Sequence, residues 1–141
     1  MPEDQRPAAL LVEAIAIAND RLAELARMIR KKPSMTSATS RIDIRNYASG
    51  LCVEMFVDSE HSSGNTITWW IEMKWKETNW EISGQVLIDS DEGQDAVRKT
   101  DRRVCESLSA TTEALSAVTN QVIAWSDVAD VSDPVSLLKA R

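Results

Sequence analysis

The only histidine of this chain, His61, stands in the segment SEHSSGN beside Glu60, Ser62 and Ser63, so an acid, a base and a nucleophile follow one another closely. Catalytic triads of these residue types draw their members from separate elements that converge on one pocket. The segment instead has the composition of a turn. We therefore interpret His61 as a solvent-exposed turn residue and predict no catalytic residues.

An acidic stretch, DSDEGQD, begins at Asp89 and has the alternating carboxylates of half a calcium loop. A calcium loop that starts there requires glycine at its sixth position and glutamate at its twelfth, but these positions hold Gln94 and Thr100. Acidic residues are also typical of the start of a helix, where they complement the helix dipole. We therefore predict neither a metal site nor a cofactor.

Two basic clusters, within residues 27–32 and 98–103, are candidates for anion binding. The whole chain is acidic, with 22 acidic and 16 basic residues and a net charge of −6, which argues against nucleic acid as a partner. The clusters also lack interleaved aromatic residues for base stacking. Anion binding stays a secondary hypothesis for Arg27, Arg30, Lys31, Arg98 and Arg102.

The elements that position these residues follow from the spacing of apolar side chains. Spacings of three and four between Leu11 and Ile29 predict a helix over about residues 8–32, which ends before Pro33. A period of two then indicates strands joined by short turns into an antiparallel meander. The four predicted strands cover about residues 41–47, 51–58, 66–76 and 79–89.

A second helix is predicted over about residues 91–126, followed by a C-terminal tail over residues 127–141. We predict a single α+β domain over residues 1–141, a four-stranded antiparallel meander with one face covered by two long helices. Because four strands separate the helices, we expect the helices to run antiparallel and the two basic clusters to share one end of the molecule.

The length of the second helix has a consequence for assembly. About 35 residues of helix span about 50 Å, whereas a ten-residue strand spans about 33 Å. The helix must therefore overhang the sheet or break. An overhanging apolar stripe needs a partner, and we predict a homodimer through the second helix.

The register of the last predicted hairpin is consistent on both of its faces. With the tip at Glu77, Trp75 pairs with Trp80 on the side that faces the helices. The same register pairs Lys74 with Glu81 on the opposite side, which is an attractive cross-strand pair.

The same alternation separates the two cysteines. Cys52 points away from the helices, whereas Cys105 falls in the second predicted helix on the other side of the sheet. We therefore expect no disulfide between them. Neither cysteine has a CxxC spacing or a neighbouring histidine, so both are interpreted as unreactive thiols.

Trp70 differs from the neighbouring Trp69, because alternation turns it toward solvent. The predicted register brings Phe56 and Leu87 near it on the adjacent strands. An aromatic anchor among polar groups is typical of a protein-binding site, and Phe56, Trp70 and Leu87 are the predicted partner-binding residues. The alternative is that these side chains only support the sheet.

We predict a non-enzymatic protein-binding module, such as an immunity-type inhibitor or a small acidic chaperone, whose charge favours a basic partner. The alternative is a small-ligand-binding protein or enzyme with a pocket between the helices and Trp69, Trp75 and Trp80. The apolar run at residues 8–18 lacks a preceding basic region, and no segment is apolar enough to span a membrane. We therefore expect a cytoplasmic protein.

Overall fold

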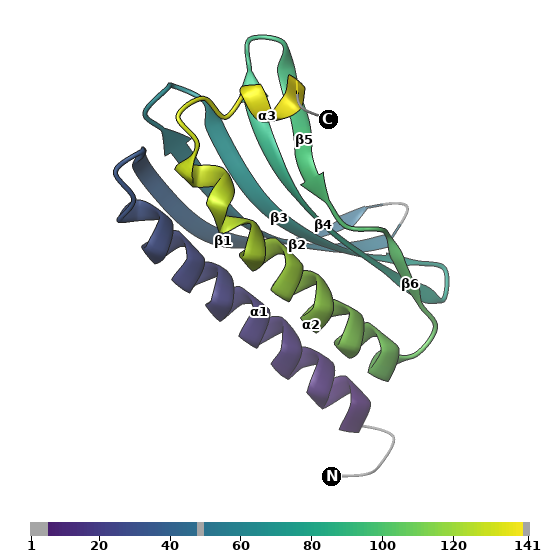
Figure 1. Ribbon diagram of the computed structural model, residues 1–141. Coiled ribbons are helices and arrows are strands. Elements are labelled where there is room, and N and C mark those ends of the chain that lie inside the picture. Colours follow the sequence, from purple (N-terminus) through teal and green to yellow (C-terminus); the bar gives the residue numbers. More distant parts are fainter. Residues whose placement is uncertain (1–5, 48–49, 140–141) are drawn as a thin grey trace.

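The structure is a computed structural model that describes residues 6–47 and 50–139 (Figure 1). Its secondary structure consists of two long helices, an antiparallel sheet and two short helical segments. In chain order the elements are α1 (Arg6–Arg30), β1 (Met35–Tyr47), β2 (Gly50–His61), β3 (Thr66–Lys76), β4 (Asn79–Ser90), β5 (Gly93–Lys99), β6 (Arg103–Cys105), α2 (Leu108–Ala124), the 3-10 helix η2 (Trp125–Asp130) and α3 (Ser136–Lys139).

The sheet is antiparallel in the order β1-β2-β3-β4-β5, and β6 pairs with β4 beside β5. The four predicted strands are all present, and the α+β class with an antiparallel sheet is confirmed. In the hairpin of β3 and β4, Trp75 pairs with Trp80 and Lys74 pairs with Glu81, as predicted. Strand β1 begins at Met35, earlier than predicted.

The prediction of a second helix over residues 91–126 is wrong in its first part. Residues 90–93 form the turn of a β4–β5 hairpin, in which Ser90 pairs with Gly93 and Gly93 adopts a φ of 113°. The acidic residues before Gly93 therefore belong to a turn and not to a helix start. Strand β5, at the edge of the sheet, carries few apolar side chains, so its period of two is not visible in the sequence.

Strands β5 and β6 form one interrupted edge along β4. Between them Thr100 bonds the backbone of Gly84 twice: Gly84 N donates to Thr100 Oγ1 at 3.0 Å, and Thr100 N donates to Gly84 O at 2.8 Å. Helix α2 begins only at Leu108, where the side chain of Ser107 caps it by accepting a bond from Ala110 N.

Helices α1 and α2 lie side by side on one face of the sheet and run parallel (Figure 1). Arg21 donates to Asn120, and further along both helices Lys32 Nζ donates to Asp130 Oδ1 at 2.6 Å. The predicted antiparallel arrangement is wrong, because the edge formed by β5 and β6 adds one chain reversal that the sequence did not reveal.

Helix α2 has 17 residues and continues into η2. A helix of this length spans about 26 Å, so the predicted overhang does not occur and the helix length gives no reason for a dimer through α2. Among the described residues, no helix combines the length and apolar character needed to cross a bilayer.

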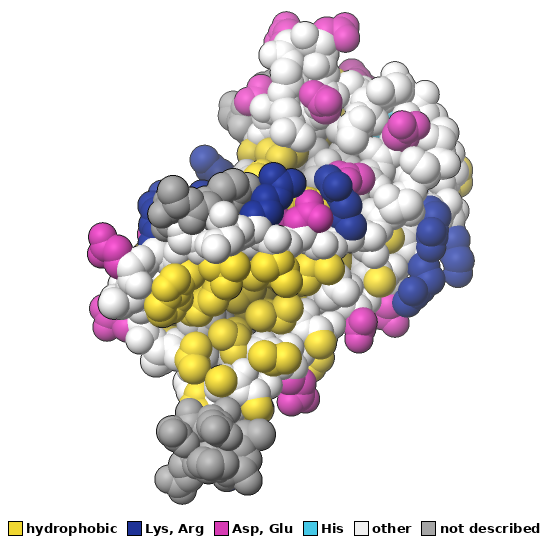
Figure 2. All heavy atoms as spheres, turned by 180° about the vertical axis from the view of Figure 1, so that it is seen from behind, with side chains coloured by type: hydrophobic (Ala, Val, Ile, Leu, Met, Phe, Trp, Pro, Cys, Tyr) yellow, Lys and Arg dark blue, Asp and Glu magenta, His cyan; other side chains and the backbone are white. Residues whose placement is uncertain are grey.

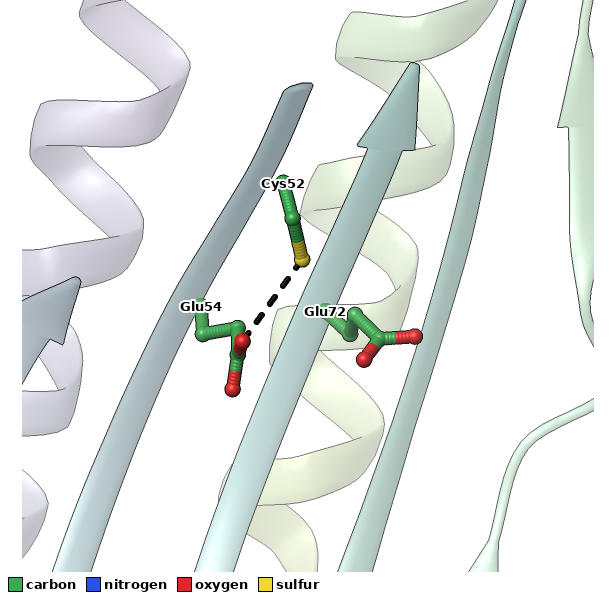
Figure 3. Close-up of side chains that lie close together, drawn as sticks. All are labelled: Cys52, Glu54 and Glu72. Carbon is green, nitrogen blue, oxygen red and sulfur yellow. Dashed lines mark hydrogen bonds between the residues drawn. The ribbon is translucent and has the colours of Figure 1, made fainter. Parts of the chain in front are cut away.

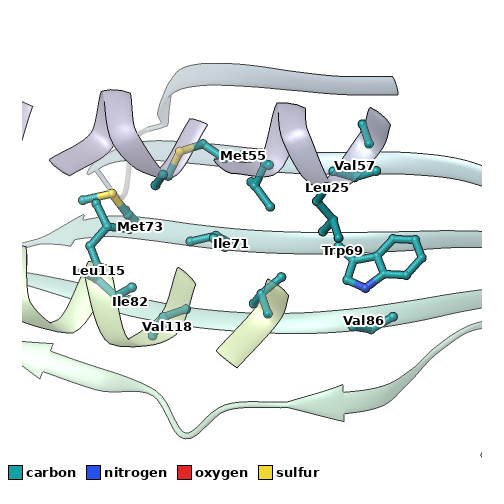
Figure 4. Packing of buried hydrophobic residues seen from close by; sticks show 14 of the residues in the cluster. Leu25, Met55, Val57, Trp69, Ile71, Met73, Ile82, Val86, Leu115 and Val118 are labelled. Atoms are coloured by element: carbon teal, nitrogen blue, oxygen red, sulfur yellow. The ribbon is translucent and has the colours of Figure 1, made fainter. Parts of the chain in front are cut away.

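The core lies between the two long helices and the sheet face that they cover, which we call the inner face (Figure 4). Trp69, Ile71 and Met73 of β3 are fully buried there. Leu25 of α1 and Leu115 of α2 pack against the same face. The opposite side, the outer face, is covered by neither long helix and positions the candidate site.

Candidate functional site

The candidate site is built on the central strands of the outer face. Successive residues of a strand point to opposite faces, so Trp69 enters the core and Trp70 points outward. Phe56 of β2 pairs directly with Trp70, and on the other side of Trp70 its partner on β4 is Gln85, two residues from Leu87. The structure therefore brings the three predicted partner-binding residues to neighbouring positions on one face.

Phe56 and Trp70 make an aromatic contact across the two strands. Their ring centroids lie 6.4 Å apart with an interplanar angle of 69°, an edge-to-face arrangement. The guanidinium of Arg41 lies over the Phe56 ring, 4.4 Å from its centroid. Each ring is therefore held by contacts with a neighbouring strand.

Polar groups hold the side chains around this pair. Arg41 Nε lies 3.2 Å from a carboxylate oxygen of Asp58, and Thr68 Oγ1 donates to the other oxygen of Asp58 at 3.1 Å. The contacts run from β1 through β2 to β3. They orient Arg41 over Phe56 before any partner is present.

The three predicted residues differ in exposure. Phe56 and Leu87 are buried, with 7% and 8% of their surface exposed, whereas Trp70 is half-buried. The Nε1–H of Trp70 is buried and has no hydrogen-bond acceptor among the described residues. Trp70 is thus the most exposed side chain of the trio, and Phe56 contacts it from β2.

A second group of side chains with ligand-type atoms lies on the same face, toward the β3–β4 turn. Cys52 and Glu54 of β2 and Glu72 of β3 place one ligand-type atom each within 4.8 Å of one another (Figure 3). Glu54 pairs directly with Glu72, and the Cys52 thiol donates to Glu54 Oε1 at 3.7 Å. No motif marks this group in the sequence, although the strand register already places Glu54 opposite Glu72.

Charge and burial decide what this group can do. Burial first, and then the negative charges of Glu54 and Glu72, raise the pKa of the Cys52 thiol from 9.0 to about 11. Lys74 Nζ lies 3.5 Å from Glu72 and neutralises part of the negative charge. Cys52, Glu54 and Glu72 are the residues that could hold a metal ion. At neutral pH, however, the thiol is protonated, and a cation must compete with Lys74 for Glu72.

Cys105 lies on the inner side of the sheet, in β6 and not on a helix as predicted. It pairs with Trp80, and burial raises the pKa of its thiol. The expected separation from Cys52 by the sheet is confirmed, and both cysteines are free.

His61 is buried and not solvent-exposed, so the turn interpretation is wrong. Its Nε2 lies 2.8 Å from Val131 O, and its Nδ1 accepts a bond from Ser63 N at 3.0 Å. A carbonyl oxygen only accepts and an amide only donates, which assigns the proton of the neutral ring to Nε2. The histidine joins the β2–β3 turn to the chain after η2, and both nitrogens are engaged in that structural role.

The two basic clusters do not share an end of the molecule, contrary to the prediction. The first, with Arg27, Arg30 and Lys31, ends helix α1 beside β1, whereas Arg98 and Arg102 lie along the opposite edge of the sheet. The separation follows from the extra edge strand, which places residues 98–103 next to β4.

Several of these basic side chains already have partners. Arg27 lies 3.8 Å from Glu24 on the surface of α1, and Arg102 lies 3.5 Å from Glu81. Arg98 donates to Val97 O at 2.9 Å. Surface pairs of this kind contribute little stability.

Trp69 of the inner face belongs to the core, and Trp80 packs against it. Trp69 is fully buried and its Nε1 donates to Trp125 O at 3.1 Å. Trp75 and Trp80 contact each other edge to face, with centroids 5.4 Å apart. A hollow of about 570 Å³ lies elsewhere, at the β2–β3 and β4–β5 turns beside α3.

Comparison of the chain with family models, with curated proteins and with solved structures finds no match.

Proposed function

We propose that this chain is a non-enzymatic protein-binding module that binds through the outer face of its sheet, with Trp70 at the centre of the site. The observation that carries the proposal is the edge-to-face pair of Phe56 and Trp70 on a face that both long helices leave open. Rigid aromatic anchors of this kind dominate the binding energy of protein interfaces.

The surroundings of Trp70 have the anatomy of an interface, with an apolar centre and a polar rim. Arg41 and Asp58 border the aromatic pair on one side. On the other side lies a polar hollow of about 250 Å³, lined by Glu72, Lys74, Lys76, Glu81, Ser83 and Arg102.

The unpaired Nε1–H of Trp70 adds to this interpretation. A buried donor without an acceptor costs about 1–3 kcal/mol. A partner that supplies an acceptor, after a small movement of the indole, would recover that cost. The new hydrogen bond to this atom would then favour the bound state of the protein over the free state.

The chemistry of the remaining groups supports binding over catalysis. The single histidine makes structural contacts through both nitrogens, and both thiols have raised pKa values that disfavour the nucleophilic thiolate. An immunity-type inhibitor and a small acidic chaperone are the two kinds of module that fit. The net charge of −6 favours a basic partner, and the free thiols favour the cytoplasm as its compartment.

The test is affinity capture from the native host, followed by calorimetric titration of the purified partner. Trp70→Glu introduces a charge at the centre of the site and is expected to weaken binding by at least about 30-fold. The matched control is Ile17→Glu on α1, which changes an exposed apolar residue of the helical layer and is expected to bind as the wild type does.

Circular dichroism and thermal unfolding of both variants show whether the fold is retained. A partner that binds a folded Trp70→Glu variant with wild-type affinity would exclude the outer face as its site. A partner lost equally in both variants would do the same.

A further inference from the structure

Strand β1 is the terminal strand of the sheet, and its outward edge faces no other strand among residues 6–47 and 50–139. It has 13 residues, and the register shifts only between Met35 and Ser37. Proteins protect long edges with prolines, bulges or inward-pointing charges. Residues 38–46 contain no proline, and their charged side chains all lie on the outer face.

An apolar surface lies beside this edge, on the side of the helices (Figure 2). Ile42 and Ile44 pair with Met55 and Val53, so they point to the inner face. They are nevertheless 38% and 68% exposed, because α1 does not cover them completely. We call Val12, Ile42, Ile44 and Leu51 the edge patch.

Val12 belongs to the edge patch because of its position around α1. Arg21, on the same helix, donates to Asn120 of α2, so its flank of α1 faces α2. Val12 precedes Arg21 by nine residues, and nine residues at 3.6 per turn place it on the opposite flank, toward β1. It is 68% exposed. Helix and strand therefore contribute to one continuous apolar surface.

The charges on β1 decide which partner fits this edge. Arg41, Asp43 and Arg45 follow one another on the outer face with alternating charge. Oδ2 of Asp43 lies 3.9 Å from Nη1 of Arg41 and 3.3 Å from Nη2 of Arg45. The pattern is its own complement: an antiparallel copy centred on Ile42 places each Arg41 opposite an Asp43, and one centred on Ile44 places each Asp43 opposite an Arg45. The register centred on Ile42 pairs residues 37–47, whereas the one centred on Ile44 pairs only residues 41–47, so the first forms the longer ladder. A copy centred on Asp43 would instead place like charges opposite one another, which is destabilising.

We propose that β1 pairs with β1 of a second copy of this chain, antiparallel around a two-fold axis at Ile42. The axis stands perpendicular to the sheet, so the helices of both copies lie on the same side and the two edge patches meet there. The ladder pairs the outward backbone groups of the two edges, and its length together with the Arg41–Asp43 pairs sets the register. Self-association is thereby assigned to β1 and α1, in place of the second helix.

Pairing through β1 does not depend on partner binding at Trp70, which lies two strands away on β3; of the side chains that pair across the proposed dimer, Arg41 also borders the partner site. The dimer can exist without a partner protein, and Trp70→Glu is expected to leave it intact. Failure of one proposal therefore leaves the other standing.

The test is the molar mass in solution, measured by multi-angle light scattering over a concentration series. The wild type is expected to be a dimer, and Asp43→Arg is expected to be a monomer because it places two arginine side chains opposite each other across the ladder. The double variant Arg41→Asp/Asp43→Arg restores opposite charges in the same register and is expected to return to the dimer. Restoration by the second change cannot result from a loss of folding.

A second pair of variants tests the edge patch. Ile44→Lys is expected to give a monomer, whereas Val104→Lys, at a residue 58% exposed on the opposite edge of the sheet, is expected to stay dimeric. Ile42→Cys lies on the axis and is expected to form an intermolecular disulfide under mild oxidation, and Val104→Cys is not. A wild type that is monomeric at every concentration, or a dimer unaffected by Ile44→Lys, would overturn the proposal.

Discussion

The Nε2 of His61 lies 2.8 Å from the carbonyl oxygen of Val131, seventy residues further along the chain. The nearby Ser34 Oγ donates to Ala129 O at 2.5 Å. These two bonds attach the end of the helical layer to the turns at one end of the sheet.

We expect His61→Ala to lower the free energy of unfolding by about 2–3 kcal/mol, because it leaves Val131 O unpaired and opens a cavity. Urea denaturation monitored by tryptophan fluorescence measures the change. Ser62→Ala, at the exposed neighbouring residue, is the control and is expected to have little effect. Equal stability of the His61→Ala variant and the wild type would contradict a structural role for the imidazole.

Gly84 allows α2 to approach β4. A Cβ atom at this position would lie 2.5 Å from Val122 Cγ2 and 2.8 Å from Val118 Cγ1. We expect Gly84→Ala to destabilise the protein by about 1–3 kcal/mol through overpacking, as measured by urea denaturation. Adding Val122→Ala to the Gly84→Ala variant should recover part of the lost stability. If the loss in the double variant equals the sum of the losses in the two single variants, the two side chains are not in direct contact.

Glu77, at the tip of the β3–β4 hairpin, has a φ of 56°, in the left-handed region. This conformation costs a side chain such as glutamate about 1 kcal/mol or more, whereas asparagine and glycine tolerate it. Glu77→Asn is therefore expected to raise the melting temperature in calorimetry. Thr78→Asn is the comparison, since Thr78 does not have positive φ, and an equal gain from both substitutions would exclude the conformational explanation.

The thiol of Cys52 should react slowly. Its pKa of about 11, against 9.0 for an ordinary thiol, lowers the thiolate fraction at pH 8 by about 100-fold. Iodoacetamide labelling followed by mass spectrometry should therefore be slow in the folded protein and fast in urea. Glu54→Gln removes a negative charge beside the thiol, so it is expected to speed the labelling of Cys52, with Cys105 as the internal reference.

The same raised pKa makes stability depend on pH on the alkaline side. Below pH 9 the thiol is neutral in both the folded and the unfolded chain, so it does not change the free energy of unfolding. Between pH 9 and about 11 the unfolded chain ionises first, so the free energy of unfolding falls. Cys52→Ala should make this fall shallower in urea titrations across that range, and an unchanged slope would contradict the shift.

Strand pairing was predictable because each central strand has one side in the core and one side outside. The resulting period of two is visible in residues 66–76, and the Lys74–Glu81 pair confirms the same register from the other face. A slip by one residue would turn Trp69 to the outer face, so no neighbouring register is compatible with its burial.

The neighbouring placement of Phe56, Trp70 and Leu87 was predictable from the sequence, but their exposure was not. The strand register is sufficient to bring Trp70 to Phe56, because partners are set by counting from the turn. Phe56 is covered by Arg41 on one strand and contacted by Trp70 on another, and both are contacts between side chains of different strands. No periodicity contains that information.

The sequence by itself determined the central strands, their register and the division of Trp69 from Trp70, because burial on one face imposes a local pattern. Only the tertiary structure decided the direction of α2, the burial of His61 and the edge formed by β5 and β6. An edge strand packs few side chains, and the ladder that joins it to β4 consists of backbone groups that every residue carries. Contacts between backbone groups leave little trace in the order of side chains. The edge strand formed by β5 and β6 nevertheless reverses the direction of helix α2.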